Sequence, residues 1–269
     1  MRVAGSNPEY TWCLWDDNTN KPAVPRVEIR LPSVTTIIKT VLAKPALVAW
    51  AYRQTRDVMT GVFGLIESGE LSIEDAVDTF TDPDMAAEWF KDNRLRPDDY
   101  ADDASSRGQA AHDYLERVAR LQLKGGRDAA LAFVVDRVDK TKDPYERGIN
   151  DWWVDHDPHV VSTEERMYSL EHGFACQTDL VWETPAGLRV VTDLKTRASV
   201  DWDVYLSDEA QVGGQQIAHD ERHERPSDHG TVLVVHETGE YKHREVRPNA
   251  GKVFLGLLTV YNEMKKGRG

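Results

Sequence analysis

The side chains best suited to chemistry in this 269-residue chain lie in a short alternating run, Leu188–Thr196. Its β-branched and apolar residues predict a β-strand. In a strand, side chains two positions apart share a face, so Asp193 and Lys195 point to one side and Leu194 to the other. The strand therefore presents a carboxylate and an ammonium group together on one face.

A second carboxylate is expected beside them. The run Phe174–Glu183 also predicts a strand, and the turn residues Thr184–Gly187 join the two strands into a hairpin. If the hairpin is centred on Ala186, Asp179 pairs with Asp193, because positions 179 and 193 are equally far from 186. Directly paired residues have Cβ atoms within roughly 5 Å of each other, so two carboxylates and an amine would meet on adjacent strands.

Paired carboxylates form a hard-oxygen site that suits Mg²⁺ or Mn²⁺ together with the oxygens of a phosphate. Such a cation lowers the pKa of a bound water, and the neighbouring Lys195 can orient or deprotonate the attacking water and screen the phosphate. The pattern therefore predicts metal-assisted hydrolysis of a phosphodiester. For the motif D-x-K in isolation, the alternative is a surface strand with a salt bridge.

The elements that must position these residues change character at about residue 159. Before it, we expect a hairpin in the first thirty residues, a helix capped by Ser33, and further helices after Pro45 and at 73–80, 98–123, 129–138 and 143–155. After it, we expect strands at 160–169, 174–183, 188–196, 231–236 and 241–246, with helices at 203–219 and 250–265. This order predicts an α/β fold with a large helical N-terminal portion: residues 1–158 would cap the site and residues 159–269 would form its core, integrated into one domain.

Composition limits the class of protein. The chain has 33 Lys and Arg against 46 Asp and Glu, a net charge of −13, but the segment Gly61–Asp103 alone contributes −10, so the charge does not exclude a DNA-binding face elsewhere. No apolar run predicts a membrane span, and the start lacks a signal-peptide pattern, so we expect a cytoplasmic protein. Cys13 and Cys176 are too few for a four-thiolate iron–sulfur cluster, and we expect none.

Six segments of the chain follow one another in a recognisable order. They are PSVTTIIK from Pro32, KPALVAWA, GQAAHDYLE, STEERMYSLEHGFACQTDLVWE, RVVTDLKT and EAQVGGQQIA. Together they resemble the PD-(D/E)XK nuclease superfamily, and more closely the RecB-like exonucleases of phages and CRISPR adaptation systems. The resemblance implies a restriction-endonuclease-like fold, in which helices flank a mixed central sheet.

The resemblance also implies a metal centre for Mg²⁺ or Mn²⁺. In a helical G-x-x-x-H element, His112 would supply a nitrogen ligand. Asp179 and Asp193 would be the two carboxylate ligands, and the main-chain carbonyl of Leu194 would be a further ligand. Lys195 would be the catalytic lysine.

Two further positions follow from the resemblance. Glu164 corresponds to the upstream acidic residue of the catalytic site; adjacent strand residues face opposite ways, so Glu164 and Glu165 cannot both serve, and the spacing favours Glu164. Gln211 corresponds to the glutamine of a Q-x-x-x-Y element that supports the site and touches DNA in relatives. Here the fourth residue on is Gln215, not tyrosine.

We therefore expect a Mg²⁺- or Mn²⁺-dependent deoxyribonuclease, an exonuclease that acts on a DNA end or single strand in recombination, repair or replication. Arg107 and Arg197 lie near the motifs and are candidates for contacts to DNA phosphates. The setting would be a bacterial or phage-infected cell, with recombination proteins as partners. The alternatives are an endonuclease and a nucleic-acid-binding or interaction module that keeps the fold but does not cut.

Overall fold

The computed structural model describes most of the chain. The described residues are 2–4, 9–13, 15–16, 21–22, 28–42, 45–93, 97–138, 140–198 and 202–267. Within them, the helices are α1 (Val34–Val41), α2 (Pro45–Ser68), α3 (Ile73–Thr81), α4 (Pro83–Asp92), α5 (Pro97–Gly125), α6 (Arg127–Val138), α7 (Pro144–His156), α8 (Leu206–Arg222) and α9 (Ala250–Lys266). The strands are β1 (Arg2–Ala4), β2 (Glu9–Cys13), β3 (Trp15–Asp16), β4 (Lys21–Pro22), β5 (Glu28–Pro32), β6 (His159–Ser169), β7 (Phe174–Glu183), β8 (Arg189–Arg197), β9 (His229–His236) and β10 (Tyr241–Glu245). None of the helices found there is long and apolar enough to cross a membrane.

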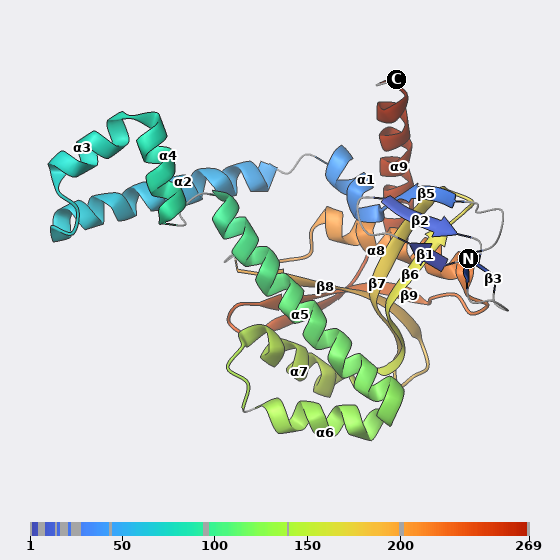
Figure 1. Ribbon diagram of the computed structural model, residues 1–269. Coiled ribbons are helices and arrows are strands. Elements are labelled where there is room, and N and C mark those ends of the chain that lie inside the picture. Colours follow the sequence, from blue (N-terminus) through green and yellow to red (C-terminus); the bar gives the residue numbers. More distant parts are fainter. Residues whose placement is uncertain are drawn as a thin grey trace. The chain divides into compact units, whose positions relative to one another are not determined.

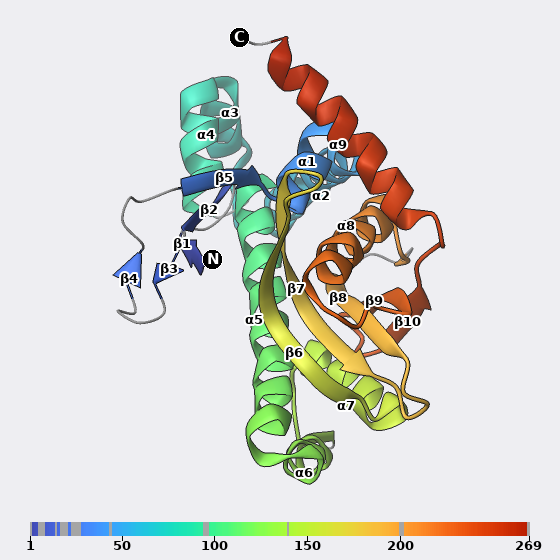
Figure 2. The same cartoon turned by 90° about the vertical axis from the view of Figure 1, so that its right-hand side faces the viewer.

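The fold is mixed α/β, centred on a five-stranded sheet of order β10-β9-β8-β7-β6 (Figures 1 and 2). β6, β7 and β8 form an antiparallel meander, α8 connects β8 to the parallel strand β9, and β10 returns antiparallel to β9. Trp182 pairs with Val190, which confirms the hairpin register centred on Ala186. The expected α/β class is therefore confirmed at this level.

The pairing of β7 with β8 covers only part of each strand. It runs from Glu183 opposite Arg189 to Leu180 opposite Thr192. The next pair, the expected pairing of Asp179 with Asp193, is not formed. Instead, the backbone N–H of Leu194 donates to the side chain of Asp179 (2.7 Å). The β7 residues before Leu180 pair with β6, so the two central strands separate where their carboxylates lie.

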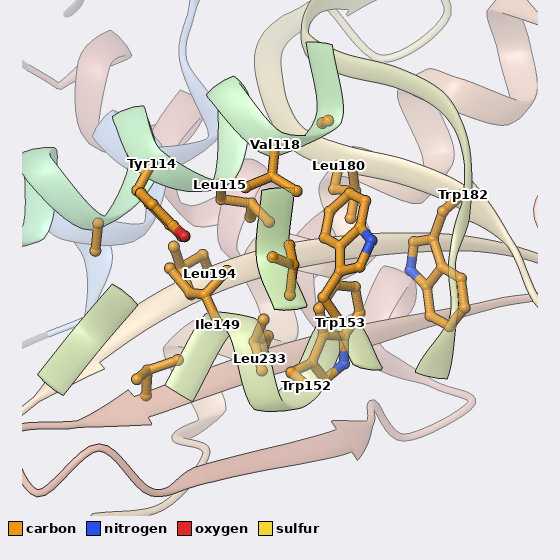
Figure 3. Packing of buried hydrophobic residues seen from close by; sticks show 14 of the residues in the cluster. Tyr114, Leu115, Val118, Ile149, Trp152, Trp153, Leu180, Trp182, Leu194 and Leu233 are labelled. Carbon is orange, nitrogen blue, oxygen red and sulfur yellow. The ribbon is translucent and has the colours of Figure 1, made fainter. Parts of the chain in front are cut away.

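Helices α5, α6 and α7 pack against one face of the sheet through an apolar cluster that we call the tryptophan core (Figure 3). Trp152 and Trp153 are adjacent on α7 and fully buried, and Trp152 meets Trp182 of β7 edge to face at 5.5 Å. Leu194 and Leu233 reach the same cluster from β8 and β9. This packing buries large aromatic surfaces and fixes the strands from one side.

The opposite face is covered by α1, α8 and α9, whose core includes Ile37, Phe174 and Phe254. The Ser33 side chain caps α1 by accepting a hydrogen bond from the N–H of Thr36 (3.0 Å), as the sequence predicted. α8 and α9 approach closely at a glycine: a Cβ on Gly213 would lie 2.4 Å from the carbonyl carbon of Ala250. Helix α8 is therefore held tightly over the sheet face that carries Asp193 and Lys195.

The chain divides into two compact units, Met1–Leu42 with Ala110–Gly269, and Ala43–Gln109. In the first unit, α6, α7 and the part of α5 from Ala110 onward share the tryptophan core with the sheet. The second unit contains α2, α3 and α4, and the rings of Phe80 and Trp89 pack α3 against α4 with centroids 5.1 Å apart.

Three local expectations need correction or lie outside the described residues. Helix α4 was not expected, although Asp82 caps it and Pro83 begins it. Helix α8 continues to Arg222, so the expected irregular connection beginning at Asp220 starts later. The expected N-terminal hairpin is present as the antiparallel pair β2 and β5, but its turn at 17–20 lies outside the described residues.

Candidate metal and catalytic site

Three side chains from three elements come together beside the point where β7 and β8 separate. Among the described residues, His112 of α5, Glu164 of β6 and Asp179 of β7 form a group whose potential ligand atoms all lie within 4.8 Å of one another. His112 Nδ1 lies 3.3 Å from Asp179 Oδ1. One imidazole nitrogen and two carboxylates therefore converge on one small volume.

The backbone explains why Glu164 reaches this group. Thr163 pairs with Leu180 and Glu165 with Thr178, so Glu164 occupies the register position opposite Asp179. Glu164 has a φ of 52°, a left-handed conformation that is uncommon for a residue with a side chain and is often found at functional sites. Its carboxylate accepts a hydrogen bond from Gln177 Nε2.

The charges of the group are linked. Burial acts to lower the pKa of His112, but the charge of Asp179 and the hydrogen bond to it raise that pKa to about 9. Burial acts to raise the pKa of Asp179, but His112 and the other donors around it hold that pKa below its usual value. Burial, together with the charge on Asp179, raises the pKa of Glu164 to about 7. The carboxylate pair is thus partly neutralised by the imidazole.

Asp193 and Lys195 form an ion pair on the face of β8 turned toward α8. Lys195 Nζ contacts Asp193 Oδ2, and Asp193 Oδ1 accepts hydrogen bonds from the Nε2 atoms of Gln211 (2.6 Å) and Gln215 (3.0 Å). Gln211 Oε1 also accepts a hydrogen bond from Lys195 Nζ (3.2 Å). α8 therefore supplies the polar partners that let a fully buried carboxylate lie inside the fold.

The protonation of Lys195 follows from these contacts. Burial acts to lower its pKa, but the charges of Asp193 and Asp179 raise it above the usual value. Burial raises the pKa of Asp193, with Lys195 acting in the opposite direction. Lys195 is accordingly an ammonium at neutral pH, and its charge stands within the field of both aspartates.

The two parts of the site are joined through the backbone of β8. Asp179 uses Oδ1 toward His112 and Oδ2 to accept the N–H of Leu194. Leu194 lies between Asp193 and Lys195, and its side chain is buried in the tryptophan core. The structure thus brings His112, Asp179, Asp193 and Lys195 to one region, with the backbone of Leu194 beside Asp179.

The remaining predicted site residues have different surroundings. Glu165 points away from the group: its carboxylate contacts His223 Nε2 (2.9 Å) and accepts a hydrogen bond from Ser162 Oγ (2.6 Å). Arg197 Nη2 donates to Asp208 (2.6 Å), and its guanidinium lies over the ring of Tyr205. Arg107 is exposed and belongs to the unit Ala43–Gln109.

Sequence reasoning missed two residues of the site, Gln177 and Gln215. Gln177 donates to Glu164, and its main-chain carbonyl accepts a hydrogen bond from Gln215 Nε2 (3.0 Å). The signal for Gln215 was its position one helical turn after Gln211, which places both amides on one face of α8. No comparable signal marked Gln177, because its role depends on the separation of β7 from β8.

The donor set fits a divalent cation. A nitrogen from His112 and carboxylate oxygens from Glu164 and Asp179 suit Mn²⁺, and the two carboxylates also suit Mg²⁺, which commonly keeps several waters and takes one or two carboxylates. Cys176 is buried, as expected for a structural cysteine, and burial raises the pKa of its thiol.

Comparisons with known proteins do not identify the chain. No family model matches it, and no curated protein matches it. Matching solved structures include one described as "Crystal structure of SSO0001", with 12% sequence identity and a TM-score of 0.31, covering 57% of this chain and 74% of that one. So low a score identifies neither fold nor function.

Proposed function

We propose that the protein is a divalent-cation-dependent nuclease that hydrolyses phosphodiester bonds in DNA. The observation that carries this proposal is the convergence of His112, Glu164 and Asp179 on one volume, beside a lysine ammonium held by Asp193. If Asp193 and Lys195 formed only a structural ion pair, the fold would not require Glu164 and Asp179 beside them. Two carboxylates held together repel each other, and His112 neutralises this pair only in part.

His112, Glu164 and Asp179 would hold the cation. The resemblance to PD-(D/E)XK nucleases adds Asp193 and the carbonyl of Leu194 as ligands. A bound Mg²⁺ or Mn²⁺ supplies Lewis acidity, which makes a water more acidic and offsets charge on a phosphate. One oxygen of Asp179 faces His112, and the other accepts a hydrogen bond from the N–H of Leu194. These two contacts orient the carboxylate without a cation.

Lys195 would act on the phosphate as a cation. Its raised pKa keeps Nζ protonated, so it donates hydrogen bonds to a phosphate oxygen and stabilises the negative charge that grows there during hydrolysis. Asp193 and Gln211 orient the ammonium. This assignment favours charge stabilisation over proton abstraction as the role of Lys195.

The finer features of the proposal rest on the resemblance. The antiparallel meander followed by a parallel strand across α8 is compatible with a restriction-endonuclease-like sheet. We propose an exonuclease that takes a DNA end or single strand, working with recombination or repair proteins in a bacterial or phage-infected cell.

The test is a cleavage assay with end-labelled linear DNA, single- and double-stranded, and with closed circular DNA, each in Mn²⁺, in Mg²⁺ and with EDTA. We expect degradation of linear DNA with either cation, none with EDTA, and cleavage about 100- to 1,000-fold slower in Lys195→Met. Cleavage of circular DNA would make the enzyme an endonuclease. Binding without cleavage of any substrate would contradict the proposal and favour the non-cleaving module.

A further inference from the structure

Gln215 occupies an unusual place at the site. It is the residue where the related Q-x-x-x-Y element has tyrosine, and it is 1% exposed, so it does not offer its side chain to a substrate. Its Nε2 atom donates two hydrogen bonds, to Asp193 Oδ1 (3.0 Å) and to the main-chain carbonyl of Gln177 (3.0 Å). Gln211, one turn earlier on α8, is partly exposed and contacts Lys195 as well as Asp193.

The two acceptors of Gln215 belong to different strands. Asp193 lies on β8 and Gln177 on β7, and both lie beyond Leu180 opposite Thr192, where the pairing of these strands ends. A single amide group therefore spans the gap between the separated strands. Because both partners are oxygen atoms that can only accept hydrogen bonds, the amide presents Nε2, and not Oε1, to them.

We propose that Gln215 is a positioning residue that sets the spacing between the Asp179 strand and the Asp193 strand, and we call these two hydrogen bonds the Gln215 bridge. The bridge replaces, from a side chain, the backbone hydrogen bonds that the separated strands do not make. Through Asp193, the bridge contacts the strand that carries Lys195. Through Gln177, it contacts the residue whose side chain donates a hydrogen bond to Glu164.

The inference rests on the proposed function only where it concerns catalysis. With the bridge in place, Asp193 and Lys195 are held at a fixed distance from Asp179. Loss of a hydrogen bond to a charged group costs about 1.5–3 kcal/mol, or about 10- to 100-fold. Because Gln215 is 1% exposed, its amide is not accessible to a substrate, so this loss should affect the chemical step and leave DNA binding unchanged.

The kinetic test compares Gln215→Met with Gln216→Met. Both changes keep the length of the side chain and remove the amide; Gln216 lies next along α8 and donates instead to Ser227 Oγ (3.2 Å). We expect Gln215→Met to lower kcat about 10- to 100-fold with KM unchanged, and Gln216→Met to leave both constants unchanged. Equal kcat in the two variants, or a change confined to KM, would overturn the proposal.

A second measurement does not depend on nuclease activity. In hydrogen exchange, the Leu194 amide, bonded to Asp179, should exchange about tenfold faster in Gln215→Met than in Gln216→Met, while Val190 and Val191 in the paired segment stay unchanged. If the wild-type protein cleaves no DNA, the proposed function fails and this exchange result alone decides the bridge. Equal exchange of Leu194 in the two variants would overturn it.

Circular dichroism and thermal unfolding establish whether Gln215→Met folds. If it does not fold, the bridge is tested in the wild-type protein, by measuring hydrogen exchange of the side-chain amides with nitrogen-edited heteronuclear NMR. We expect both side-chain amide protons of Gln215 to exchange more slowly than those of Gln216, since both are donated to buried acceptors. Exchange as fast as that of Gln216 would overturn the bridge.

Discussion

The two faces of β8 have opposite surroundings. On one face, Val190 and Leu194 are buried in the tryptophan core, and Thr192 accepts a hydrogen bond from Trp182 Nε1 (2.8 Å). On the other face, Asp193 and Lys195 meet the amide groups of α8. Val191 precedes this charged pair on the same face and is itself fully buried.

This difference explains how the molecule can keep charges close together. Burying and holding like charges is costly, and the packing on the tryptophan side supplies the rigidity that positions them. On the face toward α8, the amide groups of Gln211 and Gln215 hold Asp193, so this face combines support with charged groups. Substitutions on the two faces should therefore separate activity from stability.

The largest expected effect on activity is that of Lys195→Met. Removing the ammonium should lower kcat about 100- to 1,000-fold, the range typical for loss of one group that stabilises transition-state charge. Asp193 would keep both glutamine donors, so the folded structure should persist. DNA cleavage and thermal unfolding of the same preparation check this, and a variant that unfolds at the assay temperature would contradict the separation of the two faces.

The matching change on the other face is Leu194→Ala. Leu194 is fully buried in the tryptophan core, and such truncations cost about 2–5 kcal/mol of unfolding free energy. Its backbone N–H, which holds Asp179, is unaffected. We expect a marked shift in urea unfolding with near-normal kcat per folded molecule; a loss of activity as large as that of Lys195→Met would show that the faces are not independent.

Glu164→Gln and Glu165→Gln form a pair that sharpens the assignment of the metal centre. Glu164 belongs to the converging group, whereas Glu165 contacts His223 and Ser162. We expect Glu164→Gln to weaken Mn²⁺ binding about 10- to 100-fold, as changes around metal ligands commonly do, and Glu165→Gln to leave it unchanged. Isothermal titration with Mn²⁺ measures both, and equal losses would argue against the assignment.

The smallest expected effect concerns His243, beside the tryptophan core. Burial, with the charges of His156 and His229, lowers its pKa to about 3. Because the folded state resists protonation while the unfolded state takes up a proton near the ordinary histidine pKa, stability should fall as the pH drops below that value. This single group should cost about 2 kcal/mol at pH 5.

The control for that effect is His243→Phe, which keeps a ring beside Trp152 (centroids 5.6 Å apart in the native protein) and cannot be protonated. Its unfolding free energy should fall less between pH 8 and pH 5 than that of the wild type. Parallel curves for the two proteins would show that protonation of His243 does not contribute.

Much of the framework could be predicted because it depends on local signals. The cap at Ser33 and the turn centred on Ala186 were readable from residue type and spacing, and the structure has both. That Asp193 and Lys195 share one face of the strand, opposite Leu194, follows from strand alternation alone.

The rest depends on contacts between distant segments. The left-handed conformation of Glu164 has no signature in a residue type that rarely adopts it. The separation of β7 from β8 beyond the pair Leu180–Thr192 cannot be predicted from the alternation of residue types, because the alternation continues past that pair. The role of Gln177 follows from that separation.

The most direct test of the central claim is a crystal structure of the protein grown with Mn²⁺, with data collected at a wavelength where manganese scatters anomalously. We expect an anomalous peak in contact with His112, Glu164 and Asp179 and close to Lys195. A peak elsewhere, with these three side chains free of metal, would contradict it.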